Sequence, residues 1–285
     1  MKQMLLALVV AVVASALTVW WLGKGDGPSA QRESAYERVM RTGVLRCGYA
    51  SIPPALVVEP NTGEISGLDY EVVTALAAKL GLSVEWVEET GFGMTPLGLN
   101  GGKFDMFCTG NWIDSRKAKQ VFATLPYYYN PVMVLVRVDD HRFDEDFRRI
   151  NDESVVVAGI DNDPTIHIAE EDYPKAKLHV LPDIVSFAEA VEAMLAGKAD
   201  VMFMPYWSGM DYMEKTPGKV RVIEDKPVRS FPMGFELPRD SELKYMLDVA
   251  MRELIVSGEV KALLKNYYGN DARQYMNVAA MVEAP

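Results

Sequence analysis

The chain has 285 residues, enough for two domains of ordinary size, and 49% of them are hydrophobic, which is typical of a globular protein with a core. Its formal net charge of −11 leaves no dominant basic field, so nucleic acid is not an expected partner. Two cysteines are too few for a scaffold built from disulfides.

The first 34 residues are expected to direct export rather than to join the fold. Lys2 precedes an almost continuous apolar run over residues 4–22, and Lys24 follows it. Residues 14–16, Ala-Ser-Ala, resemble a cleavage site, but the run is also long enough to span a bilayer if it is not cleaved. Both a cleaved signal peptide and a retained anchor in the inner membrane are left open. Either one predicts a periplasmic location for the body of the protein.

Residues 44–87 predict a strand, a helix and a second strand. The first strand covers residues 44–49, and the second covers residues 82–87, where apolar and polar residues alternate. Between them, Asp69 is expected to cap a helix that Gly81 ends. The apolar stripe of this helix consists of Val72, Val73, Leu76, Ala77 and Leu80. This order predicts a βαβ unit with a parallel sheet, and therefore an α/β fold class.

Residues 102–129 carry the most informative signals in the chain. A short apolar strand over residues 104–108 breaks at Thr109-Gly110-Asn111-Trp112, which places small, polar and aromatic groups at the carboxyl end of a strand. Ligands bind at that end of the strands in open α/β sheets. A basic cluster follows, made of Arg116, Lys117 and Lys119. The segment predicts either a seat for an anion or carboxylate or a solvated basic face of a helix.

The opening of that segment has a second copy about a hundred residues later. Residues 99–107 and residues 195–203 both lead through Gly-Lys-x-Asp into an apolar strand. The glycine suits a left-handed helix end, and the apolar run suits a strand that is buried on both faces. The repeat therefore predicts two lobes of similar architecture that face one another.

A set of short motifs resembles the type II periplasmic substrate-binding proteins that serve polar amino-acid ABC transporters. The motifs are weak one by one, but they occur in family order over roughly residues 35–270. They are Leu45-Arg46-Cys47-Gly48-Tyr49, Ile52-Pro53-Pro54, Gly67-Leu68-Asp69-Tyr70-Glu71, Gly102-Lys103-Phe104-Asp105, Pro126-Tyr127 and Tyr267-Tyr268-Gly269. The resemblance implies a two-lobed fold in which each lobe is a mostly parallel sheet flanked by helices, with two strands as the hinge.

The resemblance also implies how the chain is divided. The first lobe would be discontinuous, formed by residues 35–130 plus 230–270, and the second lobe would cover residues 131–229, with a C-terminal tail over residues 271–285. Two apolar runs, over residues 131–138 and 231–238, are compatible with the two strands that cross between the lobes.

Capping residues predict where three later helices begin. Asp163 followed by Pro164 is typical of a helix start, and Ser186 with Glu189 forms a capping box. Asp240 is expected to begin a final helix that runs to Gly258. The inner face of that helix consists of Leu243, Leu247, Ala250 and Leu254.

The resemblance implies a cation that holds the carboxylate of the ligand. Family members use a Thr-x-x-Arg motif after the aspartate-led strand, because a guanidinium group pairs with both oxygens of a carboxylate. Counting from Asp105 puts Lys117 at the arginine position, whereas counting back from Phe122 points to Arg116. The threonine is missing in both registers, and either residue is left open as the clamp.

A second departure from the family concerns the ammonium group of an amino acid. The aspartate that would bind it in the second lobe corresponds here to Pro205, counted from Asp200. Asp161, which follows the predicted strand over residues 155–158, is the nearest acidic substitute. A free α-amino acid is therefore an open question, and we expect a mixed-charge solute between Asp161 and the basic pair.

Aromatic residues are expected to cover the rest of the solute. Tyr49, Trp112, Tyr206 and Trp207 all follow predicted strands, where rings can sandwich a ligand or hold a cation, or simply pack within a lobe. The predicted ligand-contacting residues are Tyr49, Gly110, Asn111, Trp112, Arg116, Lys117, Asp161, Thr165 and Tyr206.

The two cysteines are expected to lie close together. Cys47 and Cys108 both end short strands, and the resemblance places those strands side by side in the first lobe. They are either partners in a disulfide or two small buried apolar residues.

The sequence shows no recognisable catalytic or metal-binding pattern. His141, His167 and His179 lack the spacing of metal ligands, and neither a Gly-rich phosphate loop nor a Gly-x-Ser-x-Gly elbow is present. We therefore expect no catalytic residue, no metal and no cofactor.

The expected function is that of an extracytoplasmic solute-binding protein of an ABC transporter. It would capture a small polar solute, an amino acid or a related zwitterion or organic acid, by hinge closure, and the closed form would be read by an inner-membrane permease. A lyase or dehydratase on the same fold is an alternative, because a fold alone does not determine function. A membrane-tethered ligand sensor is another. The solute and the oligomeric state are left open.

Overall fold

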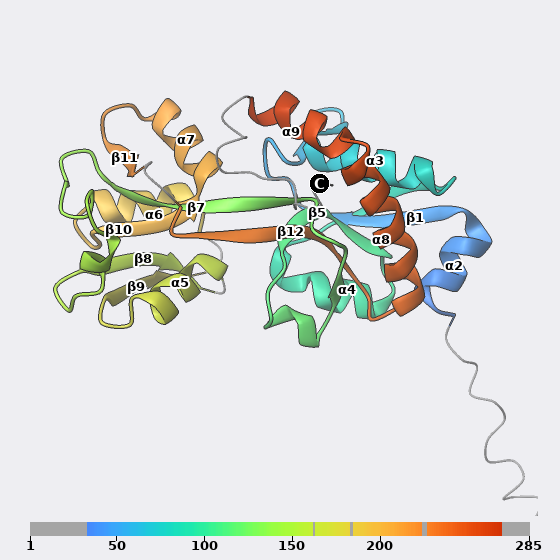
Figure 1. The fold of residues 1–285 in the computed structure, drawn as a ribbon, viewed down its shortest axis with the longest axis horizontal. Helices are drawn as coiled ribbons and strands as arrows, with labels where there is room; N and C mark the ends of the chain where they lie inside the picture. The colour runs from blue at the N-terminus through green and yellow to red at the C-terminus, as the bar shows by residue number, and fades with distance from the viewer. Residues whose placement is uncertain (1–32, 162, 183–184, 224–226, 270–285) are drawn as a thin grey trace, which may run out of the picture.

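A computed structural model describes residues 33–161, 163–182, 185–223 and 227–269, which form two lobes side by side along the long axis of the molecule (Figure 1). Two strands, β7 (Tyr128–Arg137) and β12 (Arg229–Leu237), pair antiparallel and pass from one lobe to the other. The predicted two-lobed α/β fold with two connecting strands is confirmed.

Lobe 1 contains both ends of the described chain. Its strands are β1 (Val44–Tyr49), β2 (Val57–Val58), β3 (Ile65–Ser66), β4 (Ser83–Glu89), β5 (Met106–Trp112) and β6 (Phe122–Ala123). Its helices are α2 (Ala35–Thr42), α3 (Leu68–Lys79), α4 (Thr95–Gly101), α8 (Ser241–Val256) and α9 (Glu259–Tyr268), with short 3₁₀ helices η1 (Phe92–Met94) and η2 (Lys117–Lys119). Helices α3, α8 and α9 lie over one face of the sheet, and α4 lies on the other (Figure 1).

Lobe 2 is built from one continuous stretch of chain between the two connecting strands. Its strands are β8 (Val156–Ile160), β9 (Lys177–Leu181), β10 (Val201–Pro205) and β11 (Val220–Ile223). Its helices are α5 (Pro164–Asp172), α6 (Phe187–Leu195) and α7 (Tyr206–Lys215), with the 3₁₀ helix η3 (Phe147–Ile150).

A single sheet runs through both lobes, with the strand order β4-β1-β5-β12-β7-β10-β8-β9. Strand β1 pairs parallel with β4 and β5, and β8 pairs parallel with β9 and β10, so each lobe has its own parallel portion. The antiparallel strands β7 and β12 join the two portions. In lobe 1 the carboxyl ends of the parallel strands therefore point toward lobe 2 (Figure 1).

Strand β7 supplies side chains to two separate cores. Because side chains alternate along a strand, Val132, Val134 and Val136 join one buried cluster, while Met133 and Leu135 join another. All five are fully buried. This explains why the sequence shows a continuous apolar run here rather than an alternating one.

Most of the capping predictions are confirmed. The Asp163 side chain caps α5, Ser186 and Glu189 form the capping box of α6, and Asp240 caps α8. Gly102 and Gly197 both have left-handed backbone conformations after helices, as the repeated turn requires.

Three sequence expectations need correction. Asp69 does not cap α3: Gly67 is the cap residue, and Asp69 lies inside the first turn with its side chain fully buried. Strand β5 starts at Met106 and continues to Trp112, so residues 109–112 lie within the strand because they pair with β12. The helix after Asp240 ends at Val256, and α9 follows it as a separate helix.

The predicted leader over residues 1–34 lies outside the described residues except for its last two positions, and the tail over residues 271–285 lies entirely outside them. Within the described part, no helix combines the length and apolar character needed to cross a membrane. The predicted lobe boundaries fall within β7 and at the start of β12, and they stay a prediction.

Candidate functional site

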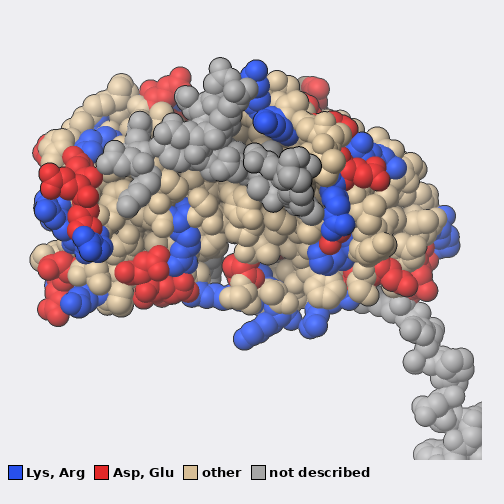
Figure 2. Space-filling view, viewed as in Figure 1, with Lys and Arg blue, Asp and Glu red and all other residues tan. Residues whose placement is uncertain are grey.

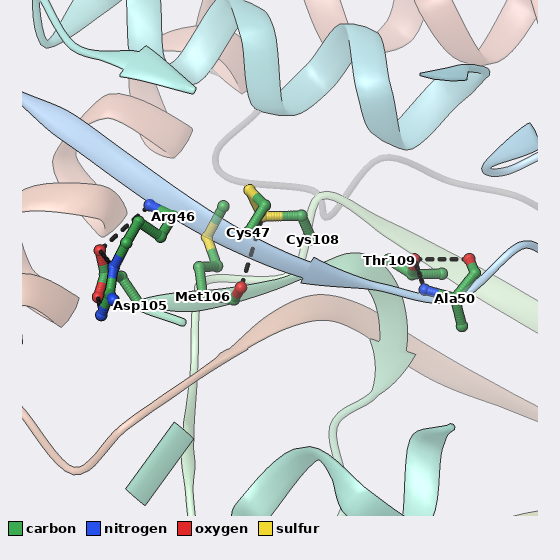
Figure 3. The surroundings of a disulfide bond; sticks show 7 residues. All are labelled: Arg46, Cys47, Ala50, Asp105, Met106, Cys108 and Thr109. Carbon is green, nitrogen blue, oxygen red and sulfur yellow. Dashed lines mark hydrogen bonds and ion pairs between the residues drawn. A yellow bond between two sulfur atoms is a disulfide. The ribbon is translucent and has the colours of Figure 1, made fainter. Parts of the chain in front are cut away.

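Strands β1 and β5 are covalently joined within lobe 1, ahead of the edge that points toward lobe 2. Cys47 and Cys108 form a disulfide with a Cα–Cα distance of 5.4 Å, and both are fully buried (Figure 3). The expected proximity is confirmed, and of the two open alternatives the structure has the disulfide. Next to it, the Thr109 hydroxyl donates to the Ala50 carbonyl at 2.8 Å and accepts from the Ala50 N–H at 2.9 Å. This edge is the candidate functional site.

The backbone of Gly110 is held in place by the buried carboxylate of Asp69. The Gly110 N–H donates to Asp69 Oδ2 at 2.7 Å, and the Tyr127 hydroxyl donates to Asp69 Oδ1 at 2.5 Å. Burial raises the pKa of Asp69 to about 7, although the hydrogen bonds from Tyr127 and Gly110 act in the opposite direction. A Cβ atom at position 110 would lie 2.2 Å from the Tyr127 hydroxyl oxygen, so only glycine fits here. Gly110 thus has a demonstrable role in packing.

Asn111 and Lys117 converge on a buried acid that the sequence analysis missed. Glu236 on β12 is 3% exposed, and its Oε1 accepts from Lys117 Nζ at 3.0 Å and from Asn111 Nδ2 at 2.8 Å. Its Oε2 accepts from the Thr95 hydroxyl. Lys117 also donates to the Phe92 carbonyl at 3.3 Å. The ammonium group of Lys117 is therefore already paired with a carboxylate of its own lobe.

Arg116 reaches across to lobe 2. Its guanidinium group lies 3.2 Å from Glu171 Oε1 and 3.9 Å from Glu170 Oε2, both at the end of α5. Arg229, at the start of β12, also pairs with Glu171 at 2.9 Å and with Asp172 at 2.7 Å. Figure 2 shows acidic and basic side chains on both sides of a gap between the lobes. Glu171 is thus shared between a cation of lobe 1 and a cation of the connecting strand.

Three of the four predicted aromatic residues, Trp112, Tyr206 and Trp207, belong to two groups of packed rings. Trp112 is 8% exposed and stacks on Phe231 with ring centroids 4.3 Å apart. Trp207 of lobe 2 stacks on Tyr268 of lobe 1 at 4.9 Å, and the edge of Tyr206 packs on Trp207. These contacts correspond to the packing alternative of the sequence analysis, and a ligand-binding role for Trp112 and Tyr206 stays a prediction.

The remaining predicted residues lie at three separate strand or helix ends. The ring of Tyr49, at the end of β1, packs edge-on against Trp86 with centroids 5.7 Å apart. Asp161 follows β8, and its backbone N–H donates to the Leu181 carbonyl at 2.8 Å. Thr165 is buried, and its hydroxyl donates to Asp163 Oδ1 at 2.5 Å within the cap of α5. Their roles in binding also stay predictions.

The sequence does not single out Glu236 or Phe231, because the run over residues 231–238 predicts only a returning strand, and Arg229 lies just before that run. A usable signal is present, since Glu236 is the one charged residue in the run over residues 231–238. A carboxylate buried in a central strand requires a positively charged or hydrogen-bonding partner.

Comparison with known proteins supports the architecture. The model of the bacterial extracellular solute-binding proteins, family 3, matches residues 45–270. In the solved structures, the chain is similar to an ancestral amino acid-binding protein that is a precursor of cyclohexadienyl dehydratase, with 27% identity and a TM-score of 0.68. That comparison covers 82% of this chain and 99% of the other.

Curated relatives are more distant but span most of the chain. A probable amino-acid ABC transporter-binding protein of Haemophilus influenzae is 22% identical, over 84% of this chain and 90% of its own length. The L-cystine-binding protein of Bacillus subtilis is 22% identical, over 95% and 99%. A cyclohexadienyl dehydratase of Pseudomonas aeruginosa is 20% identical, over 83% and 87%. The family match over most of the chain and the two-lobed fold agree, so the chain belongs to the bacterial extracellular solute-binding proteins, family 3.

Proposed function

We propose that the protein captures a small polar solute between its lobes, an amino acid or a related zwitterion or organic acid, for an ABC transporter. The observation that carries this proposal is the position of the sheet edge: β1 and β5, which are joined by the disulfide, both end pointing toward lobe 2, and β7 and β12 are the strands that connect the lobes there. A solute at this edge would touch both lobes and would favour a closed arrangement.

The proposed contacts come from both lobes. Lobe 1 would contribute Tyr49, Gly110, Asn111 and Trp112, and lobe 2 would contribute Asp161, Thr165 and Tyr206. Two features support this set. Strand β5 ends with three of these residues, Gly110, Asn111 and Trp112. Trp112 also contacts Phe231 of the connecting strand β12, which Arg229 contacts as well. Arg116 and Lys117 border the same edge but are each paired with carboxylates.

A thermal-shift screen of amino acids, organic acids and amines tests the proposal. A ligand at 100 times its dissociation constant stabilises the folded state by about 2.7 kcal/mol, which raises the melting temperature by several degrees in a protein of this size. X-ray scattering with the best ligand should show a smaller radius of gyration. The proposal fails if no solute in the screen raises the melting temperature.

Dehydratase activity is a second candidate function, because one of the curated relatives is a dehydratase. We infer binding without turnover, because the other relatives are binding proteins. Incubation of the protein with each stabilising solute, followed by mass spectrometry, distinguishes the two. Recovery of a dehydrated product would establish the enzyme.

We further propose that the protein works in the periplasm and passes its solute to an inner-membrane permease. The family assignment supports an extracytoplasmic location. A reporter that is active only in the periplasm, fused after Pro285, should be active. The mass of the mature chain would then show whether the segment over residues 1–34 is cleaved or remains as an anchor.

A further inference from the structure

The cations near the candidate site are outnumbered by the carboxylates paired with them. Lys117 pairs with Glu236, Arg116 pairs with Glu170 and Glu171, and Arg229 pairs with Glu171 and Asp172. Three cations thus face four carboxylates, and Asp161 adds a further acid at the end of β8. The local charge is negative, which favours solutes that carry positive charge.

Glu236 accepts hydrogen bonds from three donors beside the candidate site. It receives an ammonium group, an amide and a hydroxyl as donors, from Lys117, Asn111 and Thr95. It is almost completely buried, and its backbone pairs with both β5 and β6, so its position is fixed by the sheet. A ligand carboxylate that approached Lys117 would meet a cation whose charge the Glu236 carboxylate already neutralises.

We propose that Glu236 is a specificity-determining residue that makes lobe 1 select solutes without a free carboxylate at that end. The favoured class is amines and amides, including the decarboxylated relatives of cationic amino acids. This inference rests on the proposed solute-binding function and narrows its ligand class. Asn111 and the stacked Trp112 and Phe231 rings would then contact a neutral or cationic part of the solute.

Matched pairs of solutes test the inference in the unmodified protein. L-Arginine and agmatine differ by one carboxylate, as do L-lysine and cadaverine. Agmatine or cadaverine should bind at least tenfold more tightly than its amino acid, as measured by calorimetry. Tighter binding of the amino acids overturns the inference. Binding of other solutes from the screen, with none of these four, overturns it as well but leaves the proposed function intact.

Glu236→Gln keeps the size of the side chain and removes its charge, which leaves Lys117 available for an anion. We expect the preference to shift toward the amino acid of each pair by at least tenfold. Glu253→Gln, on the exposed surface of α8, changes the net charge equally and serves as the matched control. An unchanged ratio in Glu236→Gln overturns the inference.

Acetate supplies a readout that does not depend on the natural solute. It should raise the melting temperature of Glu236→Gln more than that of the parent, and the additional replacement Lys117→Met should abolish the difference. Equal acetate effects in the parent and in Glu236→Gln overturn the inference. If no solute of any class stabilises the parent, the proposed function fails, whereas the acetate comparison still reports on the pairing of Glu236 with Lys117.

Discussion

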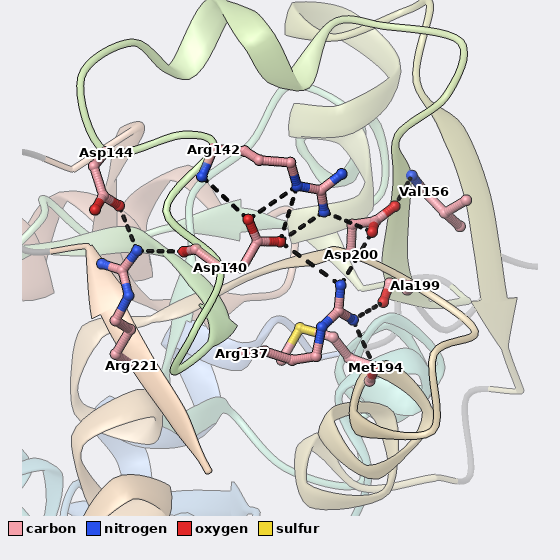
Figure 4. Close-up of polar contacts among 9 residues, drawn as sticks. All are labelled: Arg137, Asp140, Arg142, Asp144, Val156, Met194, Ala199, Asp200 and Arg221. Carbon is pink, nitrogen blue, oxygen red and sulfur yellow. Dashed lines mark hydrogen bonds and ion pairs between the residues drawn. The ribbon is translucent and has the colours of Figure 1, made fainter. Parts of the chain in front are cut away.

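The two copies of Gly-Lys-x-Asp make the same hydrogen bonds to the backbone of a neighbouring strand, but the side chains around them differ. In lobe 1, the Asp105 N–H donates to the Arg46 carbonyl at 2.8 Å, and its carboxylate accepts from the Arg46 N–H at 3.1 Å (Figure 3). In lobe 2, Asp200 makes the same two bonds with Val156, at 2.7 and 3.0 Å (Figure 4). Each aspartate thereby anchors its strand to the strand beside it.

The side-chain partners differ, and so does their burial. Asp105 is 0% exposed and pairs with the guanidinium groups of Arg46 and Arg38. The Asp200 side chain is 20% exposed and pairs with Arg137 at 3.1 Å and Arg142 at 2.7 Å, and Asp140 shares both arginines. The comparison teaches that the turn motif makes the same backbone hydrogen bonds in both lobes. The surrounding elements determine how much the charge of its aspartate contributes to stability.

The largest expected effect belongs to a feature that only lobe 1 has. Replacement of Cys47 and Cys108 together by serine opens a loop with a sequence separation of 61 residues. The chain-entropy model gives a loss of about 4 kcal/mol for a loop of that length. Hydrogen exchange should accelerate in β1 and β5 more than in β8 and β10. Equal acceleration in both lobes would show that the disulfide stabilises the whole molecule.

Asp105→Asn should have the next largest effect. The amide can still accept from the Arg46 N–H, but Arg46 and Arg38 lose the buried carboxylate with which they pair. Breaking such a pair costs about 3 kcal/mol in the free energy of unfolding. Urea denaturation measures this change, with Asp200→Asn as the matched control. A larger loss in the control would contradict the comparison of the lobes.

Asp200→Asn should cost only about 1 kcal/mol, because solvent already screens the pairs of this side chain. Burial opposes ionisation of Asp200, but the hydrogen bonds from Arg142 and Val156 outweigh it and hold its pKa below the ordinary value. Its contribution to stability is therefore present above the unfolded-state pKa near 4 and is lost as the pH falls through the lowered folded-state pKa. Unfolding between pH 2 and pH 6 should show a weaker acid-side loss in Asp200→Asn than in the parent.

The smallest effect is expected where the lobes meet. Arg116 and Glu171 are 46% and 51% exposed, so their pair should contribute less than about 1 kcal/mol. A double-mutant cycle with Arg116→Gln and Glu171→Gln measures the coupling energy, which should fall further at high salt. A coupling of several kcal/mol would mean that the contact between the lobes is as strong as the buried pair within lobe 1.

Local patterns predicted the parts of the structure that depend on neighbours in sequence. The caps at Asp163, Ser186 and Asp240 and the left-handed Gly102 are decided by a few adjacent residues. The resemblance added the pairing of β1 with β5, and with it the proximity of the cysteines.

The failures share a different cause, which is a partner far away in the chain. Asp69 looks like a cap until its acceptor role toward Gly110 and Tyr127 is known. The sequence also does not show that Glu236 and Glu171 lie beside Lys117 and Arg116, whose role as a ligand clamp stays a prediction. Charge pairing between distant residues depends on the tertiary fold, and the order of residues alone does not reveal it.

The position of lobe 2 within the chain has a consequence for synthesis. All strands and helices of lobe 2 are present once the chain has emerged as far as β11, so the buried cluster that contains Met133, Met202 and Val222 can close at that point. Lobe 1 has to wait for β12, α8 and α9, because Leu243, Leu247 and Tyr268 belong to the same buried cluster as Val72 and Leu76 of α3. The emerging chain therefore carries an incomplete first lobe, with its apolar α3 face uncovered, until α8 and α9 have also emerged.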